Sequence, residues 1–421
     1  MLKRPPAHAG SNAPAVFPAV AHPLWLCGFR PFFLFTALSG ALLVLLWGAF
    51  LGHGAPLPAV VGGPFVWHAH ELIFGFGLAA VAGFALTAVP EFTGSAAVAP
   101  RPVRRLAALW LLGRAAFWLS GWLGAPALAL SAAAHLGLLG GLIALLAPPL
   151  WADPEKRQRA FLWGLLALAG VVAGFYVDAL RGEPPARWLH AALGVLMVLI
   201  VVAMSRISMR IVNSAIDERG VAGIEYRARP PKRKLAIFCI ALYTAAEFFA
   251  PGARIGGWLA LGAAAALCHL QSDWHVGRAL WRRWPLMLFG VYVLMAAGYG
   301  LIGLALLTGG DGFSAGRHLL TVGALGLNVY AVLNIAGRTH SGHPLDERRW
   351  LPTGAALIAA AALLRAASAL PGAPAAALMG AAALCWTLPF AAYAWFMWPL
   401  LTRPRTDGRA GCAGPADDPP A

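Results

Sequence analysis

Long apolar stretches, each about as long as the path across a lipid bilayer, dominate this sequence. A membrane helix needs about 20 mostly apolar residues. Of the 421 residues, 60% are hydrophobic and only 12% are charged, about half the charge density of a soluble domain. Because so few charges cannot cover the surface of a water-soluble protein of this length, lipid must contact its outer faces. The pattern predicts an all-α integral membrane protein with about twelve transmembrane helices, over residues 31–51, 69–91, 105–124, 127–147, 160–180, 188–208, 235–250, 255–271, 285–307, 316–336, 352–370 and 374–401.

Basic side chains are distributed unevenly between the connections. If the N-terminus is cytoplasmic, 26 of the 32 Lys and Arg residues fall in inside segments and four in outside loops. The remaining two, Arg114 and Arg365, lie within spans. Cytoplasmic loops normally carry the excess of positive charge, so both termini are predicted to be inside, in the inner membrane of a bacterium. The net charge of +15 is spread over short loops and not gathered on one face, which argues against a nucleic-acid partner.

The membrane domain is predicted to span residues 31–401, after a cytoplasmic segment at 1–30. The tail at 402–421 is rich in Gly, Ala, Pro and Asp, so it is predicted to be cytoplasmic and disordered. A basic loop at 209–234 divides the twelve helices into possible halves of six. The five cysteines are scattered without a CxxC pair or a CxxCH motif, which argues against a disulfide framework, a Cys-based zinc site and covalent haem attachment.

Histidines near the outer ends of helices are the candidate metal ligands. The segment WHAHE at 67–71 contains two of them, His68 and His70. Residues two apart point about 200° apart on a regular helix, so both could hold one metal only if His68 preceded the helix. His190 or His318 could then complete the site, because neutral imidazole binds Cu, Fe and Zn. The alternative is that these residues are interfacial anchors.

Charged neighbours could support these histidines. Glu71 could orient an imidazole as an indirect partner of the metal. Arg317, next to His318, could pair with a haem propionate, although an interfacial Arg–His pair explains the pattern equally well. His135 lies among Ala, Leu and Gly; a histidine in such a setting is usually functional or paired, but the sequence does not identify its partner.

A second group of histidines is expected near the inner surface. His340 and His343 end the tenth span, and His269 could lie near them. The alternative is a polar cytoplasmic turn. Glu247, in the seventh span, is the best candidate for a proton relay, since carboxylates inside membranes are usually functional. Alternatively, buried charges in the spans could form structural ion pairs, such as one between Arg114 and Glu91.

Several segments together resemble one family, the NnrS family of haem- and copper-containing membrane proteins linked to nitric oxide metabolism. The resemblance spans roughly residues 27–345 of the chain. Its most specific parts are FRPFF and WHAHE, combined with a twelve-helix topology. The matching segments are GFRPFF at 28–33, WHAHE at 67–71, FG at 74–75, AVAGFALTAVP at 80–90, TG at 93–94, WPL at 284–286, HLLTVGA at 318–324 and HSGHPL at 340–345.

The resemblance implies non-covalent b-type haem, copper, and nitric oxide or a derived small molecule as ligand. It also implies a role in denitrification-linked metabolism or in protection from nitrosative stress, by an enzyme or by a binding protein. Candidate metal or haem ligands are then His68, His70, His318, His190 and His340, supported by Glu71, His343 and His269, with Arg30 and Arg317 as propionate or anion contacts. Relatives tend to carry Arg where this chain has His343, so the resemblance does not imply a phosphate or propionate contact at that position. The segment 205–210 resembles an Arg-containing family segment but lacks its Pro.

A secondary transporter of a small molecule, with structural histidines, is the alternative function. Six plus six helices around a central basic loop is the gross layout of the major facilitator transporters. Against this, the connection from Thr93 to Arg104 has no acidic residue, whereas that superfamily usually places an Asp there. Few carboxylates occur at mid-membrane to couple protons.

Overall fold

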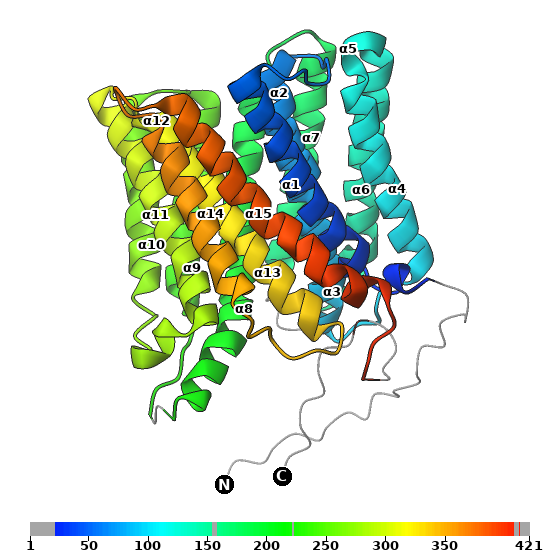
Figure 1. The fold of residues 1–421 in the computed structure, drawn as a ribbon, viewed down its shortest axis with the longest axis vertical. Helices are drawn as coiled ribbons and strands as arrows, with labels where there is room; N and C mark the ends of the chain where they lie inside the picture. The colour runs from blue at the N-terminus through cyan, green and yellow to red at the C-terminus, as the bar shows by residue number, and fades with distance from the viewer. Residues whose placement is uncertain (1–21, 154–157, 221–222, 408–411, 413–421) are drawn as a thin grey trace.

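The computed structural model describes residues 22–153, 158–220, 223–407 and 412, and helices are the only regular secondary structure in them. Figure 1 shows the helices packed side by side in one bundle. The first half of the chain contains α1 (Phe29–His53), α2 (Gly63–His70), η2 (Glu71–Gly77), α3 (Leu78–Thr93), α4 (Pro100–Trp118), α5 (Ser120–Leu123), α6 (Ala125–Ala152), α7 (Arg159–Leu180) and α8 (Ala186–Glu218). The second half contains α9 (Pro230–Phe249), α10 (Arg254–Gln271), α11 (Arg283–Thr308), α12 (Gly312–His318), η4 (Leu319–Leu325), α13 (Gly326–Thr339), α14 (Trp350–Ala367) and α15 (Ala375–Thr402). Two short 3₁₀ turns, η1 (Pro23–Trp25) and η3 (Gly277–Trp281), complete the described elements.

The twelve predicted spans all fall on these helices. Among the described residues, nine continuous helices are long and apolar enough to cross a membrane, so the chain is a multi-pass membrane protein. The three predicted spans outside this set correspond to α4, α9 and α10. Helices α4 and α9 begin with clustered basic residues, and α10 has only 18 residues. Twelve crossings and cytoplasmic termini therefore stay predictions.

The largest boundary difference from the sequence prediction is at the end of α8. Helix α8 continues to Glu218, ten residues beyond the predicted end at 208, so the connection to α9 is shorter than the predicted basic loop. The extension follows a continued apolar face, because Ile211, Val212 and Ile216 are buried.

Large apolar side chains cover the outside of the bundle. Phe249 is 83% exposed, Trp395 79% and Phe238 61%. Burying an aromatic ring is worth several kcal/mol in water, so a soluble protein would not leave such rings open on many helices. Their exposure is explained by lipid as the surrounding solvent.

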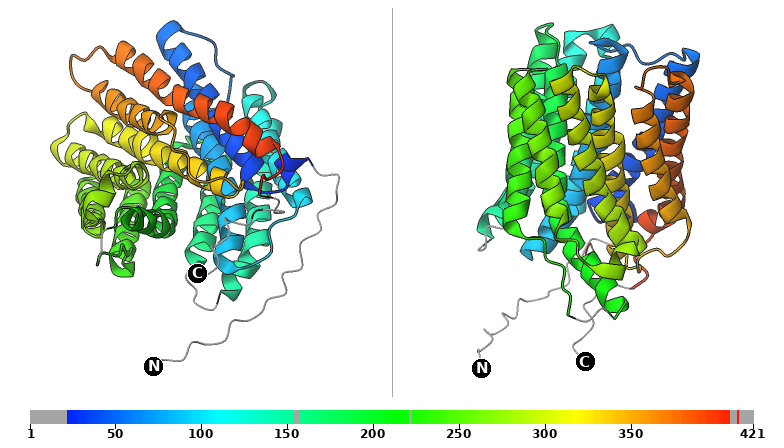
Figure 2. Two further views of the ribbon diagram at one scale, coloured as in Figure 1. Left: turned by 60° about the horizontal axis from the view of Figure 1, so that its bottom comes forward. Right: turned by 90° about the vertical axis from the view of Figure 1, so that its left-hand side faces the viewer.

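The first and last long helices of the chain pack against each other. The indole Nε1 of Trp386 on α15 donates a hydrogen bond of 2.9 Å to the carbonyl oxygen of Gly40 on α1. A Cβ at Gly40 would lie 2.9 Å from the ring of Phe76, so this contact requires a residue without a side chain. Helices from the two predicted halves are therefore neighbours, and Figure 2 shows α1 beside α15.

The end of the bundle where α1 begins and α15 ends is called the inner end here, and the opposite end the outer end. Arg30 joins the two helices at the inner end. Its Nη1 lies 2.6 Å from the carbonyl oxygen of Arg403 and 3.2 Å from that of Leu401. The guanidinium thus satisfies backbone oxygens at the C-terminus of α15, where a helix has no acceptor partners of its own. The structure places Arg30, a predicted propionate contact, in this capping position, away from the outer histidines.

The C-terminal segment is tied to the start of α1 by a disulfide between Cys27 and Cys412. The sequence argued against a disulfide framework and did not predict this single pair. The two cysteines are 385 residues apart in sequence, so only the meeting of the chain ends in space brings them together. Residues 402–407 and Cys412 have defined positions, whereas the rest of the predicted disordered tail, and residues 1–21 of the predicted N-terminal segment, lie outside the described residues.

Replacing Arg30 by Ala is expected to destabilise the protein by about 2–3 kcal/mol, because buried carbonyl oxygens lose a charged donor. The measurement is the midpoint of thermal unfolding in detergent. Arg403→Ala is the matched control, since it keeps the carbonyl oxygen that Arg30 contacts and removes only an exposed side chain. Equal midpoints for the two variants would contradict this capping role.

Candidate functional site: histidine cavities within the bundle

His68 and His318 line the same cavity near the outer end of the bundle. The cavity has a volume of about 90 Å³, and its walls come from α1, α2, η2, α12, η4, α14 and α15. Apart from the histidines, Arg365 and one threonine, the lining is apolar, and the rings of Trp47 and Trp386 form part of it. The structure therefore brings together two of the five predicted ligands, from segments 250 residues apart.

The two imidazoles of this outer cavity have ring nitrogens available. The ring of His68 stacks on Trp47 with centroids 4.2 Å apart, and its buried Nδ1 has no hydrogen-bond partner among the described residues. Nδ1 of His318 lies 2.7 Å from the carbonyl oxygen of Ser314. A carbonyl can only accept, so His318 donates from Nδ1 and keeps a lone pair on Nε2. A metal-binding histidine usually donates its other ring N–H to a carbonyl or carboxylate in this way, which fixes its tautomer.

Two π-helical segments lie beside these histidines. The segment η2 (Glu71–Gly77) begins three residues after His68, and η4 (Leu319–Leu325) begins directly after His318. Such segments are rare within α-helices and occur frequently at functional sites. Both long helices that contribute a histidine to the outer cavity thus depart from regular α-helical geometry next to it.

His70 faces a different part of the bundle from His68. Both residues lie within α2, so the about 200° between positions two apart separates them. His70 is fully buried, and its ring stacks on Phe117 with centroids 3.5 Å apart. The condition for a shared metal, that His68 should precede the helix, is not met in this structure.

A buried chain of hydrogen bonds begins at His70. Its Nε2 lies 2.9 Å from the hydroxyl of Tyr176, and that hydroxyl lies 3.0 Å from Nδ1 of His135 and 2.6 Å from Oγ of Ser131. Nδ1 of His135 also lies 3.0 Å from the carbonyl oxygen of Ser131. The partners of His135, which the sequence did not identify, are thus on α6 and α7.

The donors in this chain run in one direction. Nδ1 of His70 lies 3.1 Å from Oε1 of Glu71 and donates to the carboxylate, so Nε2 of His70 accepts from Tyr176. The tyrosine oxygen then accepts from His135. Such a one-way network can pass a proton, and its low-dielectric setting strengthens each bond.

Glu71 is held by Arg114, whose Nε donates to Oε2 at 2.8 Å. The suggested alternative pairing of Arg114 with Glu91 is wrong. Glu91 lies at the inner end of α3, where His340 and Arg210 are its partners, whereas Arg114 lies near the outer end of α4. The predicted role of Glu71 as an orienting partner agrees with its contact to His70, although no metal is needed for that contact.

A third group contains His190, Arg317 and Glu247. Arg317 donates from Nη1 to Nε2 of His190 at 2.8 Å and from Nη2 to Oε1 of Glu247 at 3.0 Å. These residues line a separate cavity of about 230 Å³ with Tyr243. The buried Oε2 of Glu247 has no partner among the described residues. Arg317 and His318 serve different cavities because successive helical residues point about 100° apart.

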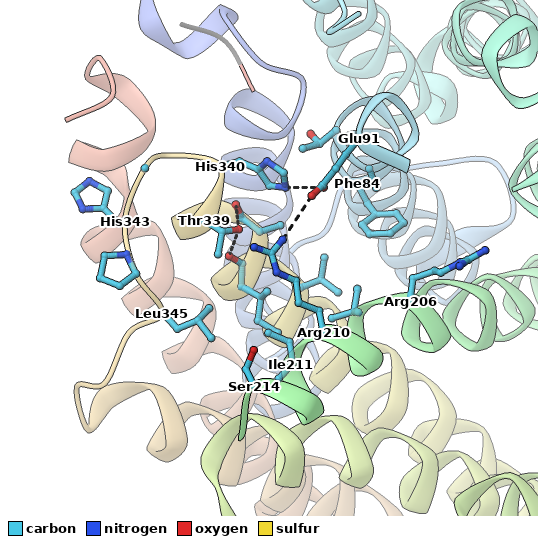
Figure 3. Close-up of a pocket in the computed structure, with 18 of the residues that line it drawn as sticks. Phe84, Glu91, Arg206, Arg210, Ile211, Ser214, Thr339, His340, His343 and Leu345 are labelled. Atoms are coloured by element: carbon cyan, nitrogen blue, oxygen red, sulfur yellow. Dashed lines mark hydrogen bonds and ion pairs between the residues drawn. The ribbon is translucent and has the colours of Figure 1, made fainter. Parts of the chain in front are cut away.

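A further cavity lined by histidines, of about 680 Å³, lies at the inner end between α3, α8 and α13. Figure 3 shows His340 and Arg210 both directed at Glu91. Nε2 of His340 lies 3.4 Å from the Glu91 carboxylate, and Nη1 of Arg210 lies 3.7 Å from it. Nδ1 of His340 lies 2.8 Å from the carbonyl oxygen of Cys412. Phe33 and Phe84 supply apolar walls deeper in the bundle.

His343 also lines this inner cavity, whereas His269 does not. Burial lowers the pKa of His343, and the nearby Arg338 and Arg405 lower it further. His343 is therefore neutral at pH 7. His269 is exposed on α10, so the structure does not bring this predicted neighbour to His340.

Tyr176, Ser131 and Trp47 belong to these sites but were not predicted. Ser131 is four residues before His135 on α6, a spacing that places the two side chains on one face, so the sequence held a signal for it. Tyr176 and Trp47 carried no such signal, because aromatic residues near span ends usually anchor membrane helices.

Among the described residues, no three His, Cys, Asp or Glu side chains converge in a way that could hold a metal ion. A metal at the outer cavity would therefore have two protein imidazoles and open positions. Fold and cavities together define a multi-pass, all-helical membrane protein with histidines facing internal spaces. The sequence pattern of the family described as "NnrS protein" matches residues 23–405, and the chain belongs to this family. No curated protein matches the chain.

Replacing Arg114 by Leu is expected to destabilise the protein by about 3–5 kcal/mol, because it leaves the buried Glu71 carboxylate unpaired. Thermal unfolding in detergent measures the effect. Arg105→Leu is the control, because Arg105 is exposed on the same helix, and it should change stability by less than about 0.5 kcal/mol. The double change Arg114→Leu with Glu71→Leu should recover most of the loss, and no recovery would argue against the ion pair as the cause.

Asp346, in the loop after His343, gives a pH-dependent prediction. Burial raises its pKa, but hydrogen bonds from Arg348 and Trp350 and the charge of Arg338 outweigh this and lower the pKa to about 2. The ionised form thus stabilises the folded loop above the unfolded pKa of about 4, and this is lost as pH falls towards 2. Asp346→Asn should cost about 1–2 kcal/mol at pH 7 and little at pH 2. A cost that does not change with pH would contradict it.

Proposed function

We propose that this NnrS family protein holds copper and haem inside the membrane and acts in nitric oxide metabolism or in protection from nitrosative stress. The proposed location is the inner membrane of a bacterium. The observation that carries the proposal is the outer cavity, where His68 and His318 meet from distant segments with ring nitrogens available. Nitric oxide, or a small molecule derived from it, is the proposed ligand.

Copper fits the outer cavity better than haem does. Pockets for organic cofactors usually have about 300–1,000 Å³, whereas this cavity has about 90 Å³. That space suits a metal ion with one small ligand. Imidazole is a normal copper ligand, and copper bound there would supply an open position for a diatomic molecule. Arg365 lines the same cavity and would stabilise negative charge on the bound ligand.

Haem fits the inner cavity, whose volume of about 680 Å³ is within the range for cofactors. His340 would be the ligand, with its Nδ1 held by the carbonyl oxygen of Cys412. Its Nε2 lies 3.4 Å from the Glu91 carboxylate and would exchange this contact for the iron. Arg206 and Arg210 line the cavity and would contact the propionates. The iron would supply a strong binding position for nitric oxide, and attachment would be non-covalent because the sequence has no CxxCH.

The chain's own residues would bind, orient and move protons around these metals. The relay from His135 through Tyr176 to His70 runs next to α2, the helix that also carries His68. Its side chains face away from the outer cavity, so it would move a proton within the neighbouring part of the bundle if the bound molecule is converted and not only stored. Glu71 and Arg114 hold His70 in the tautomer that this direction requires.

A transporter function has one observation in its favour. Glu247 has an unpartnered buried oxygen in a cavity of about 230 Å³ beside Arg317, and intramembrane carboxylates couple protons in many transporters. Under this alternative, small-molecule transport in proteoliposomes would stop with Glu247→Gln and persist with His318→Ala. The metal-binding proposal requires neither result.

The test compares metal content in four purified variants. His68→Ala and His318→Ala should lose copper, measured by elemental analysis, and keep haem, measured by the Soret band. His340→Ala should lose haem and keep copper. His275→Ala is the control, because this exposed histidine lies outside the cavities described above, and it should keep both.

Three results would contradict the assignment. Copper that remains in both outer variants would exclude the His68–His318 pair. Haem lost from the outer variants, with copper retained, would reverse the two cofactors. A wild-type protein that contains neither cofactor, when it is produced in cells supplied with both, would remove the proposed function itself.

A further inference from the structure

Three cavities follow one another through the bundle between its inner and outer ends. The inner cavity and a small middle cavity share Phe33, Phe84 and Val332 as lining residues. The middle cavity and the outer cavity share Leu325. A residue that lines two cavities separates them by no more than its own side chain. The cavities therefore form an interrupted line that ends at the outer histidine pair.

The middle cavity lies where the helices of the two predicted halves meet. Its walls come from α1, η2, α3 and α8 of the first predicted half and from η4 and α13 of the second. The spans that contain α3, α8 and α13 are the most buried of the candidate membrane spans, whereas α1 lies at the surface beside α15 (Figure 1). Side chains from both predicted halves of the chain therefore line this space.

The lining of the middle cavity is almost entirely apolar. Small residues such as Ala80 and Ala203 leave the space, which has about 60 Å³. Asn328 is the one polar side chain in the lining. It is only 7% exposed, and its Oδ1 has no hydrogen-bond partner among the described residues. An unpaired buried amide oxygen costs free energy, so its presence here needs a reason.

Size and polarity together define what could occupy this cavity. A cavity of about 60 Å³ has room for a molecule of diatomic size and is far below the roughly 300–1,000 Å³ of pockets for organic ligands. No charged side chain lines the space, so an ion entering it would lose its hydration without compensation. A small, uncharged and weakly polar molecule fits, and Asn328 offers it a single dipole.

The side chains between the cavities are positioned to move. Leu325 is the last residue of η4, and Gly77, which also lines the middle cavity, is the last residue of η2. Both π-helical segments thus end at the middle cavity and begin beside the outer histidines. Rotation of Leu325 on one side, or of the Phe33 and Phe84 rings on the other, would connect neighbouring spaces without any helix movement.

We propose that this line of cavities is an internal route for a small uncharged gas between the inner cavity and the His68–His318 pair, with Asn328 as a resting position on the way. The identity of the gas as nitric oxide rests on the proposed function. The route itself does not, because it follows from the shared lining residues and the volume of the middle cavity.

Xenon tests the route without any metal. Crystals of the full chain, pressurised with xenon, should show the gas in the middle cavity bounded by Phe84, Ala203 and Val329, because apolar cavities of this kind bind xenon. Ala203→Phe should abolish that site. Ala80→Leu, on α3, narrows the same space by a smaller side chain and replaces Ala203→Phe if the larger change prevents folding. Xenon in the outer cavity alone, with the middle cavity empty, would overturn the route.

Nitric oxide binding tests whether the route is used. Freeze-quench EPR of the oxidised copper would follow nitric oxide arriving at the outer cavity. Ala203→Phe should slow arrival by about tenfold, a barrier increase of about 1.4 kcal/mol, with copper content unchanged. Ala241→Phe is the matched control, since Ala241 is exposed on α9 and should leave the rate as in the wild type. An unchanged rate in Ala203→Phe would show direct entry from lipid or from the outer side and overturn the route.

The two tests separate failure of the route from failure of the proposed function. If the protein holds no copper, the xenon experiment still decides whether the middle cavity admits a gas. If copper is present and xenon avoids the middle cavity, the route fails while the metal assignment stands.

Discussion

Inside a bilayer no water is available to hydrogen-bond a polar group, and the rest of this structure depends on that constraint. Each polar side chain in the bundle must find a partner within the protein or remain at a cost. The chain meets this requirement by collecting its polar side chains into a few compact groups. The Glu71–Arg114 pair, the Arg317–Glu247 pair and the Glu91–His340 pair are each supplied by two different long helices. These groups therefore fix which helices are neighbours.

Among the described residues, fourteen buried side-chain nitrogen and oxygen atoms lack a hydrogen-bond partner, and four of them belong to the internal sites. Nδ1 of His68, Oε2 of Glu247 and Oδ1 of Asn328 each belong to a residue that lines a cavity, and Nε2 of His135 ends the buried relay. An atom left unpaired at such a cost is more easily explained by a ligand or a proton than by stability alone. Packing elsewhere is close, as at Gly40, where a methyl group would already collide. The contrast between close packing and small polar-edged cavities is what links this fold to a role in binding small molecules.

Sequence alone predicted the helices well and the sites only in part. Long apolar stretches and the basic connections located all twelve helical segments, because lipid imposes length and charge rules that are visible locally. The pairing of His68 with His318 was among the predicted combinations, yet nothing local could select it over His68 with His70. Helical geometry made the latter doubtful, and the structure supplied the deciding fact that α2 already includes both residues.

The predictions that failed depended on the distance between helices. The sequence suggested Glu91 as a partner of Arg114, but the structure pairs Arg114 with Glu71 and places Glu91 at the other end of the bundle. Cys27 and Cys412 are paired only because the ends of α1 and α15 meet. Tyr176 had no distinguishing pattern, and its role became visible only through three hydrogen-bond partners on other helices or turns. Residues of this kind are defined by tertiary contacts and not by local sequence.

The visible absorption spectrum of the purified wild-type protein, oxidised and then reduced with dithionite, with and without nitric oxide, tests the central claim most directly. Copper would be measured in the same sample. The account predicts a Soret band that shifts when nitric oxide is added, together with near-stoichiometric copper. A colourless, copper-free protein from cells supplied with haem and copper would contradict it, and the histidines of the outer and inner cavities would then be structural.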